Sequence, residues 1–205
     1  GYASPVVINI ANEKQIVMVG AAGGGWGAPP SGGKVVGIDP NSGKILWEYG
    51  GFQCSIPSNP AIEAGDSKIL IAGGYNAGSA MLKIEKKADG TYAANELFKT
   101  TDFGAHTLPP VLVSGYFYGH YGTNERRDGL VCMSMDGQIK WKSGRSPEFN
   151  KGSMIYADGL LLATDGAKKL FLIEPDPTAF KPIASAELLK PGGVDTSNGM
   201  TNFGG

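Results

Sequence analysis

The chain has 205 residues, of which 41% are hydrophobic and 18% charged, and its formal net charge is −1. This length and hydrophobic content are enough for a substantial core, while the near-neutral charge gives no electrostatic reason to expect nucleic acid or an acidic membrane surface as a partner. The sequence contains no run of about 20 apolar residues, the length that a transmembrane helix needs.

Four short apolar hairpins recur along the chain, and each begins at a small residue or a proline. Their starts are residues 4–7, 59–62, 109–112 and 152–155. Each start leads through a turn into an apolar run, at 16–19, 69–72, 116–118 and 160–163. The pairs Ser114-Gly115 and Asp158-Gly159 favour tight hairpin turns, because glycine readily takes the positive φ that such turns require.

A second hairpin follows each of these and closes near an aromatic residue. The clearest copy spans 35–47, where a tight turn separates two strands and Trp47 ends the second strand. A copy at 130–141 has a shorter turn and ends at Trp141, and in the two weaker copies Phe98 and Ala186 align with Trp47. Copies therefore recur every 40–50 residues or so, which is the period of a four-stranded propeller blade.

The sequence predicts an all-β fold, a β-propeller of four-stranded antiparallel blades with about four blades present. The expected blades cover roughly 1–50, 51–100, 101–145 and 146–190, and 191–205 begins a further blade or forms a tail. The alternative is an all-β sandwich with accidental regularity. Because four blades of this kind seldom close a ring and would leave exposed strand edges, we expect part of a ring of about seven or eight blades, completed by the same or another chain.

The hairpin at 35–47 resembles the repeat of quinoprotein-type propellers, known as the PQQ-like repeat, after pyrroloquinoline quinone. The matching residues are an acidic turn residue, a glycine and a closing tryptophan: Asp39, Gly43 and Trp47 in the first copy, and Asp136, Gly137 and Trp141 in the third. The run 151–161 is similar to the secreted bacterial branch, which includes relatives of the lipoprotein scaffold of the outer-membrane assembly machine. The resemblance implies a periplasmic or extracellular location.

The resemblance also implies structural roles for these motif residues. In the family, the tryptophan packs between neighbouring blades, against the glycine-containing turn of the adjacent repeat. A large aromatic side chain buries much apolar area in such a position. Asp39 and Ser42 are of the residue types that hydrogen-bond the backbone of their own turn.

Two sets of loops are expected on one face of the ring, where quinoprotein enzymes hold their ligand. They are the loops between blades and those between the second and third strands, at 20–34, 49–59, 73–80, 100–109, 121–129 and 144–152. The candidate ligand-face residues are Trp26, Gln53, His106, His120, Asn124 and Arg145. His106 and His120 are the only histidines; without a third ligand nearby in the sequence they do not predict a metal site.

The first functional hypothesis is a non-catalytic scaffold or binding module that docks a protein partner or a larger assembly, without a cofactor and without catalytic residues. One alternative is a PQQ-dependent quinoprotein dehydrogenase, with calcium and with cofactor residues partly outside this chain. The other is a carbohydrate-binding propeller that uses Trp26 and neighbouring asparagines. Cys54 and Cys132 are expected to be free thiols, partly buried, and no disulfide is predicted.

Overall fold

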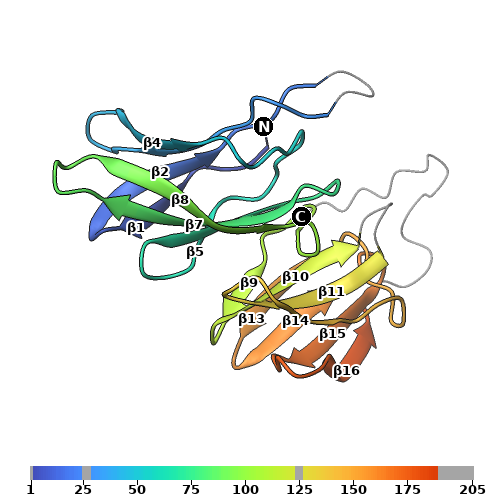
Figure 1. The fold of residues 1–205 in the computed structure, drawn as a ribbon. Helices are drawn as coiled ribbons and strands as arrows, with labels where there is room; N and C mark the ends of the chain where they lie inside the picture. Colours follow the sequence, from blue (N-terminus) through green and yellow to red (C-terminus); the bar gives the residue numbers. More distant parts are fainter. Residues whose placement is uncertain (1, 25–28, 123–126, 189–205) are drawn as a thin grey trace.

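The computed structural model describes residues 2–24, 29–122 and 127–188 (Figure 1). Over these ranges the chain is all-β and forms four four-stranded antiparallel sheets. In each sheet the strands pair in the order in which they occur along the chain. Every sheet is therefore a simple meander, built from one continuous segment of sequence.

The strands of the four sheets are as follows. Sheet 1 contains β1 (Val6–Ile10), β2 (Glu13–Val19), β3 (Val35–Ile38) and β4 (Ile45–Tyr49). Sheet 2 contains β5 (Ile62–Glu63), β6 (Lys68–Gly73), β7 (Gly78–Lys86) and β8 (Tyr92–Thr100). Sheet 3 contains β9 (Val111–Val113), β10 (Tyr116–Gly122), β11 (Arg127–Ser134) and β12 (Ile139–Lys142). Sheet 4 contains β13 (Met154–Ala157), β14 (Leu160–Thr164), β15 (Lys169–Glu174) and β16 (Lys181–Glu187).

The tight turns expected from the sequence join the first two strands of sheets 3 and 4. Ser114 and Gly115 have φ values of 49° and 83°, and Asp158 and Gly159 have φ values of 49° and 80°. Positive φ at both central residues defines the type I′ turn, whose twist matches that of the flanking strands. These hairpins therefore follow directly from the local residue types.

The last two strands of every sheet share one irregularity, a register shift within the ladder. It falls at Gly37/Ile38, Met81/Leu82, Cys132/Met133 and Leu172/Ile173. Just before the shift, Gly37 pairs with Trp47, and the corresponding partner in sheet 4 is Ala184. Ala184 and not Ala186 thus takes the tryptophan position of the fourth repeat. The structural repeat corrects that alignment by two residues, because only pairing reveals the register.

Consecutive sheets pack through their apolar faces, so the core consists of three layers of buried side chains between neighbours. Ile8, Val17 and Trp47 of sheet 1 pack with residues of sheet 2 such as Ile69 and Leu82. Similar layers lie between sheets 2 and 3 and between sheets 3 and 4. Figure 1 shows the sheets following one another from blue to red. This face-to-face succession of four-stranded meanders is consistent with propeller-like blades.

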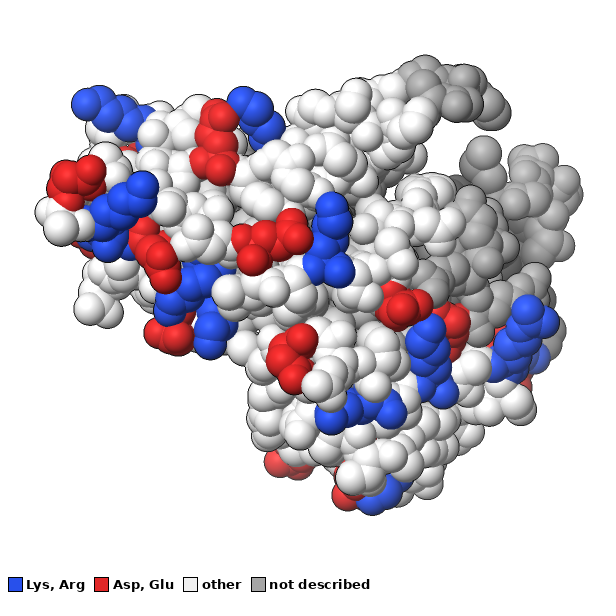
Figure 2. All heavy atoms as spheres, in the orientation of Figure 1, with Lys and Arg blue, Asp and Glu red and all other residues white. Residues whose placement is uncertain are grey.

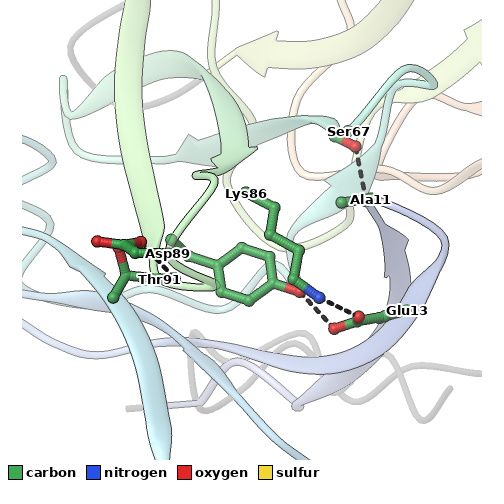
Figure 3. A network of polar contacts seen from close by, with 7 residues as sticks. Ala11, Glu13, Ser67, Lys86, Asp89 and Thr91 are labelled. Carbon is green, nitrogen blue, oxygen red and sulfur yellow. Dashed lines mark hydrogen bonds and ion pairs between the residues drawn. The ribbon is translucent and has the colours of Figure 1, made fainter.

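Polar contacts join sheets 1 and 2 at the end that carries the β1–β2 turn (Figure 3). The Glu13 carboxylate accepts hydrogen bonds from the Lys86 ammonium and the Tyr92 hydroxyl, and these two donors lower the pKa of Glu13. The Ala11 amide donates to Ser67 Oγ at 2.8 Å. Because the ion pair is exposed, it contributes little to the free energy of folding.

Both cysteines, Cys54 and Cys132, are free thiols and are buried. Burial raises the pKa of each thiol, to about 11 for Cys132. They therefore act as small apolar core residues and lack the thiolate character of a reactive cysteine. None of the described residues belongs to a helix long and apolar enough to cross a membrane.

Candidate functional site

Three chain connections meet at the end of sheets 1 and 2 opposite the polar contacts of Figure 3. They are 50–61 between β4 and β5, 74–77 between β6 and β7, and 101–110 between β8 and β9. Ser58 Oγ donates a hydrogen bond to the His106 carbonyl, and Asn59 Nδ2 donates to the Ala105 carbonyl at 2.7 Å. Asn59 is fully buried. Two polar side chains of the first connection thus fix the backbone of the third.

The middle connection is a tight turn that presents Tyr75. The Tyr75 and His106 rings lie 4.5 Å apart between centroids, tilted by 56°. Tyr75 and Asn76 both have left-handed backbone, with φ of 53° and 61°. A Cβ on Gly74 would lie 3.0 Å from the His106 Cα. The turn therefore approaches the third connection as closely as it does because position 74 carries no side chain.

Gln53 holds the β2–β3 connection against the β4–β5 connection. Its Oε1 accepts from the Gly33 amide at 3.0 Å, while its Nε2 donates to the Gly33 and Gly50 carbonyls at 3.2 and 2.6 Å. Next to it, the Ala22 amide donates to the Cys54 carbonyl at 2.9 Å. Both ends of the Gln53 amide thus hydrogen-bond to backbone groups, so this residue stabilises the conformation of the two connections.

Large apolar side chains stand exposed on these fixed connections. Ile56, Tyr75 and Leu108 are 40%, 45% and 40% exposed. Together with the half-buried His106 we call them the rim patch. In the view of Figure 2, charged side chains gather over the opposite, turn-bearing end of sheets 1 and 2, and few lie toward the end with the connections. An aromatic and two aliphatic side chains on a fixed backbone can bury apolar area against another molecule.

His120 lies apart from the rim patch, in β10 between sheets 3 and 4. It is 6% exposed, and its ring meets the Phe149 ring edge-on at 5.7 Å. Neither ring nitrogen makes a hydrogen bond of normal geometry, although backbone groups of Ser153 and Asn150 lie near enough to favour the charged form. Burial outweighs them and lowers the pKa of His120 to about 4. The imidazole is neutral at physiological pH.

The other sequence candidates fall in different places. Arg145 is exposed and forms an isolated β-bridge with Glu148 in the connection after β12. Trp26 and Asn124 lie outside the described residues. The structure therefore brings Gln53 and His106 to one set of connections and leaves His120 and Arg145 with sheets 3 and 4. Within the described ranges, no group of three or more His, Cys, Asp or Glu is placed to hold a metal ion.

The repeat-motif residues lie in the turns and inter-sheet layers. Each turn between the last two strands of a sheet has an aspartate that binds its own turn: Asp39, Asp89, Asp136 and Asp176. Hydrogen bonds lower the pKa of these carboxyls. The largest effect comes from the Ser42 hydroxyl at Asp39 and from the Lys181 ammonium at Asp176. Gly43 and Gly137 take positive φ, 71° and 86°, in the first and third turns. This is the local bonding that turn aspartates provide.

The aromatic residues of the motif connect neighbouring sheets. Trp141 Nε1 donates to the Asp176 carbonyl, in the turn of sheet 4, at 2.7 Å. A Cβ on Gly137 would lie 2.8 Å from the Phe98 ring of the preceding sheet. Trp47 is 4% exposed, lies over Gly37 of its own sheet, and donates from Nε1 to Gln15 Oε1 at 2.7 Å. Phe98 and Trp141 thus lie against the turn of the following sheet.

Sequence reasoning missed Tyr75, Ser58 and Asn59, which build and present the rim patch. The available signal was Gly73-Gly74-Tyr75-Asn76 directly after the buried strand β6, a run whose glycines and asparagine favour a tight turn. The loop expected over 73–80 is shorter in the structure, because Gly73 and Gly78 still pair across β6 and β7.

The chain matches no protein-family model and no curated protein. The sheets, the connections and the residues that they present are therefore the basis for inferring its function.

Proposed function

We propose that the chain is a non-catalytic scaffold that docks a protein partner or a larger assembly through the rim patch. In this proposal the four sheets are blades of a PQQ-like repeat propeller of about seven or eight blades, exported to the periplasm or the cell exterior. The succession of four-stranded meanders and the motif turns support the propeller. The resemblance of the repeat to the secreted branch supports the location.

One observation carries the docking proposal: exposed apolar side chains lie on a backbone that hydrogen bonds from polar side chains hold in place. Ile56 lies two residues from Ser58, and Leu108 lies two residues from His106, whose carbonyl accepts the Ser58 hydrogen bond. Tyr75 contacts the His106 ring. A surface that is already ordered loses little conformational entropy on binding, so more of its contact energy appears as affinity.

The rim patch favours a protein partner by its chemistry. Exposed aromatic and aliphatic side chains on connections at one end of the sheets are typical of the apolar centre of a protein interface. Among the described residues, no contact supports the dehydrogenase hypothesis or the carbohydrate hypothesis. The carbohydrate hypothesis rests on Trp26, which lies outside them.

Site-specific photo-crosslinking tests the proposal in cells that naturally make the protein. A photoreactive phenylalanine derivative replaces Tyr75 in one variant and Tyr156 in a second. Both tyrosines are 45% exposed, and Tyr156 lies in β13, far along the chain from the rim patch. We expect a discrete adduct with one protein from position 75 and no such adduct from position 156. Equal adducts from both positions, or none from position 75, would refute docking at the rim patch.

Truncation gives the matching affinity test. Tyr75→Ala should weaken capture of the crosslinked partner by about tenfold or more, since removing an aromatic anchor from an interface centre commonly costs over 1.4 kcal/mol, or one factor of ten. Tyr156→Ala should leave capture unchanged. Retained capture by Tyr75→Ala would show that the crosslinked contact carries no binding energy.

A further inference from the structure

The outer face of sheet 1, which no other sheet of the described residues covers, carries a row of apolar side chains. Val7, Met18 and Ile45 on this face are 61%, 42% and 55% exposed. Between them lie the half-buried Ile16 and Ile38, which pair across β2 and β3. The opposite face of the same sheet supplies Val17 and Trp47 to the core, so both faces are apolar, as in a sheet with neighbours on both sides.

The outer face of sheet 4 has the same character. Ile155 is 59% exposed, and both its partner Leu162 on β14 and Leu172, which pairs with Leu162 from β15, are half-buried. Ala184 extends this row onto β16. Leu161 and Ile173, which point to the other face, are buried against sheet 3. The array therefore has an exposed apolar sheet face at each end.

The structural repeat shows that these two outer faces are not equivalent. One corresponds to the face that a sheet packs on the preceding sheet, and the other to the face that it packs on the following sheet. Relative to the register shift and the tight turn, Ile16, Met18 and Ile38 correspond to Ile69, Ile71 and Leu82 of sheet 2. Those three residues are completely buried against sheet 1. Sheet 1 thus exposes the face that sheet 2 uses toward its predecessor.

Sheet 4 exposes the other kind of face. Leu162 and Leu172 correspond to Tyr118 and Cys132 of sheet 3, which are buried against sheet 4. Sheet 4 therefore exposes the face that each earlier sheet uses toward its successor. The outer faces of sheets 4 and 1 therefore correspond to the two faces that meet in each internal layer.

We propose that a second copy of this chain covers both faces, with sheet 4 of each copy packed on sheet 1 of the other. Two copies related by a twofold axis make this head-to-tail contact twice and expose neither apolar face. Together they supply twice four sheets, a number at which propellers close. The inference rests on the propeller fold proposed above and is independent of docking at the rim patch.

Sedimentation equilibrium of the purified chain, from nanomolar to micromolar concentration, tests the inference. We expect a concentration-dependent species of twice the 21.4 kDa chain mass. Met18→Glu and Ile155→Lys each place a charge in both copies of the contact and should weaken dimerisation by about tenfold or more. Leu97→Glu is the control, since Leu97 is 50% exposed on β8 of sheet 2 and lies on neither outer face.

Mixing the two charged variants distinguishes a head-to-tail ring from other dimers. One of the two contacts in a mixed dimer is then wild-type, and the other contains both the glutamate and the lysine. Mixing should therefore restore dimerisation above that of either variant alone. A monomer at all concentrations would overturn the inference. A dimer that Ile155→Lys leaves unaffected would overturn it too, and neither result would alter crosslinking at position 75.

Discussion

At the scale of single residues, burial changes the acid–base chemistry of His120. Its imidazole is buried between sheets 3 and 4 beside Phe149, and burial lowers its pKa from 6.5 to about 4. The folded state therefore binds fewer protons than the unfolded state between these values. Stability that is fully present above about pH 6.5 should fall as the pH drops toward 4, by up to about 3 kcal/mol.

Urea denaturation of the wild-type protein and His120→Gln, measured from pH 7 to pH 4, checks this expectation. The carboxylates titrate alike in both proteins, so the difference isolates the histidine. We expect the wild type to lose more stability than the variant over this range. Parallel stability curves would show that His120 is protonated in the fold without cost.

Trp47 is a buried aromatic residue of the layer between sheets 1 and 2. It is 4% exposed, and its ring nitrogen donates to the buried Gln15. Trp47→Ala should lower the free energy of unfolding by roughly 3–5 kcal/mol, through lost burial and a residual cavity. Trp47→Phe should cost less, about 1–3 kcal/mol, mainly because Gln15 loses its partner. Denaturant unfolding measures both, and a cost below about 1 kcal/mol for alanine would contradict the buried position.

At the scale of elements, the pairing of β3 with β4 requires a glycine. A Cβ on Gly37 would lie 2.1 Å from the Trp47 ring nitrogen. The indole occupies the space that a Cβ would need, so Gly37→Ala should displace it and destabilise the fold by about 1–3 kcal/mol, the usual cost of overpacking.

Gly50→Ala is the matched control, because a Cβ there meets nothing within 4 Å and the residue has no positive φ. It should change the midpoint of thermal unfolding little, while Gly37→Ala should lower it by several degrees or more. Equal midpoints for the two variants would show that the indole moves away from position 37 without cost.

At the scale of the whole molecule, the four sheets stack in chain order, and each sheet has a backward face toward the preceding sheet and a forward face toward the following one. Each internal layer joins the forward face of one sheet to the backward face of the next, and the two ends leave one face of each type open. The head-to-tail ring would use both. It would also present the rim patch twice, so that a partner with two matching sites would bind with avidity greater than the affinity of one patch.

The sequence by itself determined the turns and the repeating four-stranded sheets of this protein. The turns at Ser114-Gly115 and Asp158-Gly159, and the motif turns at Asp39 and Asp136, form where the pattern predicted them, because turn geometry depends on adjacent residues. Apolar runs and a recurring hairpin pair likewise indicated four-stranded antiparallel sheets. These features are set by interactions within a few residues of the chain.

Tertiary structure decided what no local pattern contains. The meeting of Tyr75 with His106 depends on two connections 30 residues or so apart, brought together by sheet pairing and by Asn59. The burial of His120 depends on sheet 4 packing over sheet 3, and the place of Ala184 opposite Leu172 depends on a register shift. Packing and register arise from the summed contacts of whole sheets, so residues adjacent in the sequence cannot reveal them.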